Sequence, residues 1–70
     1  MHPNTLYAWL LKETGMRPRG GPGYFYWVNA KNEVALWAPS IYVNALGQLT
    51  PKQWLEEAQL AAKIESLGKK

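Results

Sequence analysis

Two apolar, aromatic-rich runs on either side of a short polar turn constrain this chain more than any other feature. The runs cover residues 24–29 and 33–38, and the turn between them is Ala30-Lys31-Asn32. Such a pattern is typical of a β-hairpin. We therefore predict a hairpin over residues 24–38. Asn32 suits the left-handed position of a three-residue loop, because asparagine tolerates positive φ better than other non-glycine residues.

Pairing Asn29 with Glu33 assigns both faces of this predicted hairpin, because side chains alternate along a strand. One face then carries Tyr24, Tyr26 and Val28. The other carries Phe25, Trp27 and Trp37, and we predict that it is the better-buried face because its groups are the bulkiest. A ribbon with one solvated face should alternate apolar and polar residues, yet here both faces are apolar. Either helices cover both faces, or one face meets a partner.

A helix is predicted on the N-terminal side of the hairpin, over residues 3–14. Asn4 or Thr5 can cap its N-terminus. Leu6 and Leu10 share one face at i, i+4 spacing. Gly15 stands where a left-handed C-terminal cap is expected. A helix this short is unstable in isolation, so it must pack on the rest of the chain.

The second predicted helix, over residues 51–67, has the clearest start signal in the chain. Thr50 is the N-cap, Pro51 takes the first helical position, and Gln53 completes a Thr-x-x-Gln capping box. At 100° per residue, one apolar arc contains Trp54, Leu55, Ala58, Ala61 and Ala62. A second apolar strip contains Leu60, Ile64 and Leu67. This strip either covers another part of the chain or contacts a partner, since exposed apolar patches often mark interfaces.

The remaining segments are predicted to be less regular. Residues 16–23 hold two prolines and three glycines, which predicts a loop. Residues 41–46 are either a short third strand or a 3₁₀ turn, and residues 68–70 form a tail. The fold class is therefore α+β: a single small domain over residues 1–70, in which two helices pack on an aromatic antiparallel sheet.

Composition restricts the function. The chain has 70 residues, no cysteine and one histidine, so we expect no disulfide, no metal and no cofactor. No run of about 18 apolar residues is present, so we expect no membrane partner. Missing cysteine is compatible with a reducing compartment, and we expect a cytoplasmic location. No two of the five glutamates have the pattern of a general acid and base held in one cleft, so we expect no enzyme.

Two functions remain, and the first is a protein-binding module of the inhibitor or adaptor type. It rests on the aromatic excess, because Trp, Tyr and Arg dominate interface hot spots. The strip on the second helix adds a surface for a partner or for a second copy of the chain. The predicted partner-binding residues are Arg17, Arg19, Tyr24, Tyr26, Leu60, Ile64 and Leu67.

The alternative is a nucleic-acid-binding module. The net charge is +3 and the isoelectric point is about 9.4, which permits such a partner without demanding it. Arg17 and Arg19 could hold phosphates while the neighbouring aromatic rings stack on bases. The feature that separates the two functions is whether positive charge and exposed aromatic rings share one face.

Overall fold

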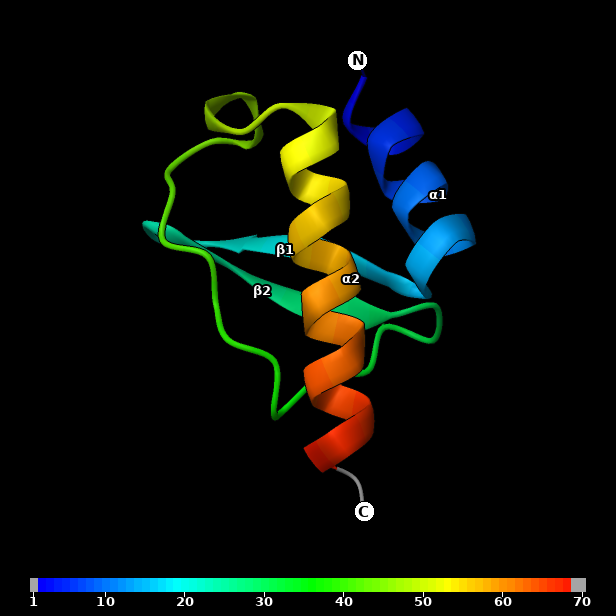
Figure 1. Ribbon diagram of the computed structural model, residues 1–70. Helices are drawn as coiled ribbons and strands as arrows, with labels where there is room; N and C mark the ends of the chain where they lie inside the picture. Colours follow the sequence, from blue (N-terminus) through cyan, green and yellow to red (C-terminus); the bar gives the residue numbers. More distant parts are fainter. Residues whose placement is uncertain (1, 69–70) are drawn as a thin grey trace.

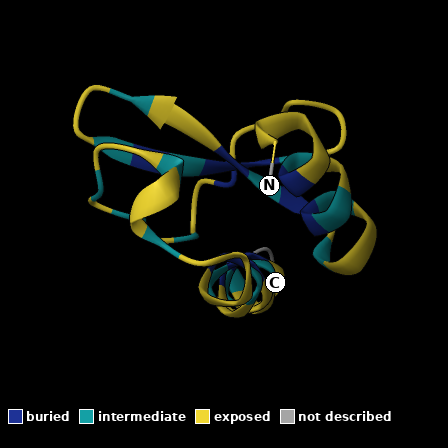
Figure 2. Cartoon of the chain, turned by 90° about the horizontal axis from the view of Figure 1, so that it is seen from above, coloured by how far each residue is buried: buried dark blue, intermediate teal, exposed yellow. Residues whose placement is uncertain are grey.

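The computed structural model describes residues 2–68 and confirms the α+β class (Figure 1). Its elements, in order, are α1 (Pro3–Thr14), β1 (Met16–Gly21), β2 (Tyr24–Asn29), the 3₁₀ turn η1 (Leu46–Gln48) and α2 (Pro51–Gly68). Helix α2 crosses one face of the two-stranded sheet, and α1 lies beside α2 at one end of the sheet (Figures 1 and 2). The prediction of residues 68–70 as a tail is wrong at Gly68, which ends α2, and Lys69 and Lys70 lie outside the described residues.

The hairpin does not pair the two runs that were predicted to form it. Residues 16–21, expected to be part of a loop, form β1 and pair antiparallel with β2, from Met16 opposite Asn29 to Gly21 opposite Tyr24. Pro22 and Gly23 make the connection, and Gly23 has φ 76°. Proline followed by a residue with positive φ is the pattern of a type II turn.

Proline within β1 is tolerated because of its place in the pairing. Pro18 lies opposite Trp27 on a strand that, within residues 2–68, pairs in the sheet with β2 alone. Antiparallel pairs alternate between hydrogen-bonded and non-hydrogen-bonded sites, counted from the two-residue turn. Position 18 falls on a non-hydrogen-bonded site, so its nitrogen points away from β2 and no ladder bond is lost.

Part of the predicted hairpin, the turn and the first pairs beside it, is present on the other edge of β2. The Asn29 amide donates to the Glu33 carbonyl at 3.0 Å, Asn32 has φ 63°, and Val28 pairs with Val34. Beyond Ala35 the predicted pairing is wrong. The chain leaves the sheet and returns only at Ile41, which replaces Trp37 opposite Phe25. The third-strand alternative for residues 41–46 is therefore reduced to this single bridge, and the 3₁₀ turn follows at Leu46–Gln48.

The excursion from the sheet has a simple cause. The segment from Val34 to Ile41 is longer than the part of β2 that it faces, so the extra residues must bulge outward. Pro39 lies within it and has no N–H for a ladder bond. Trp37, predicted to lie on the better-buried face of the hairpin, leaves the sheet with this segment and is 57% exposed.

The core forms where α1 and α2 meet the sheet. Trp54 of α2 is fully buried and makes edge-to-face contacts with Phe25 and Trp27, at ring-centroid distances of 5.4 and 6.0 Å. The predicted inward arc of α2 is confirmed, since Ala58 and Ala61 are buried beside Trp54. The remaining buried members of this core are Leu6, Leu10, Met16 and Ala35.

The helix ends follow the capping rules, with one correction. Thr50 and Gln53 form the predicted capping box: the Gln53 amide donates to Thr50 Oγ1 at 3.1 Å, and the Thr50 amide donates to Gln53 Oε1 at 2.8 Å. At α1 the cap is His2, whose Nδ1 accepts from the Asn4 amide at 3.2 Å. The predicted caps, Asn4 and Thr5, lie inside the helix because Pro3 starts it.

Candidate binding surface on the sheet

The face of the sheet opposite α2 gathers arginine and tyrosine side chains. Phe25 and Trp27 contact Trp54 of α2, so the alternating residues of β2 point to the other side. The register of the strands places Arg19 beside Tyr26. We name this surface the arginine–tyrosine face, and its members are Arg17, Arg19, Tyr24, Tyr26 and Tyr42.

Three tyrosine rings make a continuous group on this face. The ring of Tyr24 lies 6.1 Å from that of Tyr26 and 6.5 Å from that of Tyr42, measured between centroids. Tyr24 and Tyr26 are half-buried, and Tyr42 is 81% exposed. Gly21 makes room for this arrangement, because a methyl group at position 21 would lie 2.7 Å from Cζ of Tyr24.

The two arginines differ in how they are held. The Arg17 guanidinium lies 5.1 Å from the ring centroid of Tyr7 in α1, and its Nη2 donates to Asn32 Oδ1 at 2.9 Å. Arg17 also lies opposite Val28, which is fully buried although it belongs to the face that was predicted to be the less buried one. An arginine can cover an apolar neighbour with its aliphatic stem. Arg19 is exposed, so its charge is presented to solvent.

The seven predicted partner-binding residues do not form one surface. Arg17, Arg19, Tyr24 and Tyr26 come together on the sheet. The strip of Leu60, Ile64 and Leu67 belongs to α2, on the other side of that sheet. Leu60 and Leu67 are 47% and 57% exposed, and Ile64 is half-buried.

Two tyrosines of this region were not among the predicted partner-binding residues. Tyr42 belongs to the arginine–tyrosine face, and Tyr7 lies beside it. The signal for Tyr42 was present in the sequence, since a strand at residues 41–43 would have put Ile41 inward and Tyr42 outward. The Ile41 bridge to Phe25 produces that placement. Tyr7 could not be found in this way, because its contact with Arg17 depends on how α1 packs beside β1.

A cavity of about 310 Å³ lies between α2 and the open end of the hairpin, where β1 begins and β2 ends. Two glutamates, Glu33 and Glu65, are among the residues that line it. Glu65 is only 7% exposed, and its Oε1 accepts from the Trp37 amide at 2.8 Å. The sequence contained a signal for this burial, because Glu65 follows Ala58 and Ala61 at the i+7 and i+4 positions of the inward arc.

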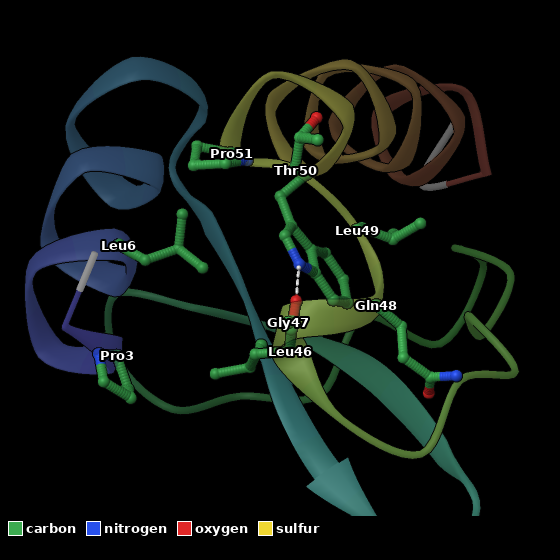
Figure 3. Close-up of a pocket in the computed structure, with 9 residues that line it drawn as sticks. Pro3, Leu6, Leu46, Gly47, Gln48, Leu49, Thr50 and Pro51 are labelled. Carbon is green, nitrogen blue, oxygen red and sulfur yellow. Dashed lines mark hydrogen bonds between the residues drawn. The ribbon is translucent and has the colours of Figure 1, made fainter.

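A groove of about 300 Å³ lies between the starts of α1 and α2 and the turn η1 (Figure 3). Trp54 lines it, and the indole N–H of Trp54 donates to the Leu46 carbonyl at 2.8 Å. The other lining residues are Pro3, Leu6, Leu46, Gly47, Gln48, Leu49, Thr50 and Pro51. None of these side chains is ionisable, so the groove supplies packing and neutral hydrogen bonds.

Over residues 2–68, no group of three or more acidic or histidine side chains is arranged to hold a metal ion. In the same part of the chain, neither helix has the length and apolar character needed to cross a bilayer. Comparison with protein families, with characterised proteins and with solved structures finds no match, so the function is inferred from this chain's own residues.

Proposed function

We propose that this protein is a non-catalytic binding module that binds single-stranded nucleic acid on its arginine–tyrosine face. One observation carries the proposal: three tyrosine rings share one side of the sheet with the charges of Arg17 and Arg19. Tyr42 is exposed, and Tyr24 and Tyr26 are half-buried. Sequence alone favoured a protein partner. The arrangement of these side chains favours nucleic acid as the partner instead, because positive charge and aromatic rings on one face were expected of a nucleic-acid-binding module.

The chemistry of the face suits an unpaired strand. Bases stack on aromatic rings with a gain of about 1–3 kcal/mol per base, and arginines attract the phosphates between them. The residues that strand alternation places here contribute two positive charges and no negative charge. Duplex DNA fits less well, because tyrosine rings stack on the faces of unpaired bases, whereas the paired bases of a duplex present only their edges in the grooves.

A protein partner is the second candidate, and the exposure of Leu60 and Leu67 on α2 favours it. Apolar side chains spaced by two helical turns on an open helix face are typical of contacts with another protein or a second copy of the chain. In this form the module would be an inhibitor or adaptor. A cytoplasmic location is part of both proposals, since the sequence has no cysteine.

Fluorescence anisotropy with labelled oligo(dT) of about 15 nucleotides tests the first proposal, because that length lies within the roughly 4–16 nucleotides that a single OB-fold covers. Binding is measured between about 50 and 200 mM salt, where phosphate contacts weaken strongly. In the double variant Arg17→Ala/Arg19→Ala, the log–log salt slope should flatten by about one to two units, roughly one per lost phosphate contact. Arg19→Ala alone is the cleaner variant, because Arg17 also contacts Tyr7 and donates a hydrogen bond to Asn32 within the fold.

Two further double variants separate the candidates. Tyr24→Ser/Tyr26→Ser should remove most of the affinity for the oligonucleotide, because stacking is lost. Leu60→Ser/Ile64→Ser should leave it unchanged, because the strip lies on α2. The nucleic-acid proposal is wrong if the wild-type protein does not bind oligo(dT), or if the Arg17→Ala/Arg19→Ala variant binds it with unchanged affinity and salt dependence. Capture of a protein partner that the Leu60/Ile64 variant loses would support the second candidate instead.

A further inference from the structure

Arg17 is held in place by three parts of the chain, and each of these partners is neutral. Its guanidinium lies 5.1 Å from the ring centroid of Tyr7 in α1. Its Nη2 donates to Oδ1 of Asn32 at 2.9 Å, and its Nη1 donates to the Pro18 carbonyl at 3.3 Å. A ring, a side-chain amide oxygen and a peptide oxygen thus orient the guanidinium without cancelling its charge.

Arg19 belongs to the same face but is held differently. It lies two positions further along β1 and is exposed, and over residues 2–68 its guanidinium has no contact of the kind that holds Arg17. A mobile arginine loses rotamer freedom when it binds a phosphate, whereas a positioned arginine has already lost that freedom during folding. The two arginines carry the same charge, but phosphate binding costs Arg17 less entropy.

Arg17 can bind a phosphate without giving up its contacts within the fold. A guanidinium has five N–H donors, and the bonds to Asn32 and Pro18 use two of them. The side chain is half-buried, so part of it remains at the surface. Phosphate oxygens accept strong, charge-assisted hydrogen bonds from such donors.

We infer that Arg17 is a preformed phosphate contact and that Tyr7 and Asn32 are its positioning residues. The inference rests on the proposed binding of single-stranded nucleic acid, and it gives a role in that binding to two residues outside the arginine–tyrosine face. Tyr7 comes from α1, and Asn32 comes from the turn that follows β2. Both segments therefore contribute to affinity through Arg17, while Arg19 contributes charge without such support.

Affinity of the full chain for oligo(dT) tests this inference with two variants, each of which removes one support. Tyr7→Leu removes the aromatic ring but keeps an apolar side chain. Asn32→Gly removes the acceptor, and glycine tolerates the φ of 63° at this position. Each should raise the Kd about two- to tenfold, the scale of ordering one long side chain. Tyr7→Phe is the conservative control and should bind like the wild type, because it keeps the ring beside Arg17.

A double-mutant cycle separates positioning from a general structural role. Both variants are repeated in an Arg17→Met background, which keeps an aliphatic stem opposite Val28 and removes the charge. There, Tyr7→Leu and Asn32→Gly should change the Kd by less than about twofold, as expected when their only route to the ligand is gone. In an Arg19→Ala background their full effect should remain. A full effect in the Arg17→Met background would overturn the inference, because the two residues would then act independently of Arg17.

A second measurement needs no oligonucleotide. In the free protein, ¹⁵N relaxation of the arginine Nε–H groups should give an order parameter of about 0.85 for Arg17 and below about 0.6 for Arg19. Equal mobility of the two side chains would overturn the inference even if the Arg17→Met protein did not fold. If the wild-type protein does not bind oligo(dT), the proposed function fails and the phosphate contact fails with it. If it binds without coupling between Arg17 and its supports, only the role of Tyr7 and Asn32 is overturned.

Discussion

Trp54 is the residue on which the packing of this chain depends most. It is fully buried, contacts Phe25 and Trp27 edge to face, and donates its indole N–H to the Leu46 carbonyl. It therefore joins α2 to the inward face of β2 and to the turn η1. Removing it leaves a large cavity at the meeting point of three segments.

Trp54→Ala should lower the free energy of unfolding by about 3–5 kcal/mol, as for other buried aromatic truncations. In a domain of this size such a loss is comparable with the whole stability, so the variant should be largely unfolded at room temperature. Thermal melting followed by circular dichroism checks this. Trp54→Phe is the matched control: it keeps a ring against Phe25 and Trp27, gives up the hydrogen bond to Leu46, and should melt between the two. A Trp54→Ala protein that melts within a few degrees of wild type would contradict this packing.

Single residues also show which positions could be predicted from the sequence and which could not. The inward positions of Phe25, Trp27, Ala58 and Ala61 were predictable, because alternation and helical periodicity are local properties. The exposure of Trp37 was not, because it depends on where the chain rejoins β2 after Ala35. The burial of Glu65 was not predicted: its position fits the inward arc of α2, but glutamate is almost never fully buried unless it is paired.

At the level of elements, the helices were predictable and the strand β1 was not. Capping signals such as Thr50 and Gln53 act within a few residues, so they can be read directly from the sequence. The glycines and prolines of residues 16–23 are also turn signals, and they led to the prediction of a loop over the whole segment. Within this segment, only Pro22 and Gly23 form a turn. The rest of the segment is a strand because position 18 needs no N–H and β2 supplies a partner along its length.

The hairpin assignment can be tested at its turn. Gly23 has φ 76°, and its surroundings leave room for a methyl group, since the nearest atom would be Asn44 Oδ1 at 3.6 Å. Gly23→Ala should therefore be destabilising by about 1–2 kcal/mol for backbone reasons alone, because a left-handed conformation costs other residues that amount. Gly23→Asn should cost less, because asparagine tolerates this conformation.

Chemical denaturation of the two variants beside the wild type measures this difference. Gly47→Ala provides a comparison, because Gly47 does not have positive φ and a methyl group there would meet nothing within 4 Å. Equal stability of Gly23→Ala and wild type would mean that residues 22 and 23 do not form the tight turn between β1 and β2.

For the whole molecule, the fold class followed from the sequence while the grouping of functional residues did not. Local patterns predict helices and aromatic strands, but they do not state which strand pairs with which. Pairing β1 with β2 is what brings Arg19 beside Tyr26, and the bridge at Ile41 is what adds Tyr42. The same topology separates the strip on α2 from the sheet face. One predicted set of seven residues thus becomes two surfaces with different chemistry.

The central claim is that the face of the sheet opposite α2 is the binding surface, and amide chemical-shift mapping with oligo(dT) tests it most directly. Titration of the ¹⁵N-labelled protein should shift the signals of Arg19, Tyr24, Tyr26 and Tyr42, while those of Leu60, Ile64 and Leu67 stay in place. Raising the salt concentration should reverse the shifts, because the phosphate contacts release counterions. Shifts confined to the α2 strip, or none at any oligonucleotide concentration, would contradict the claim.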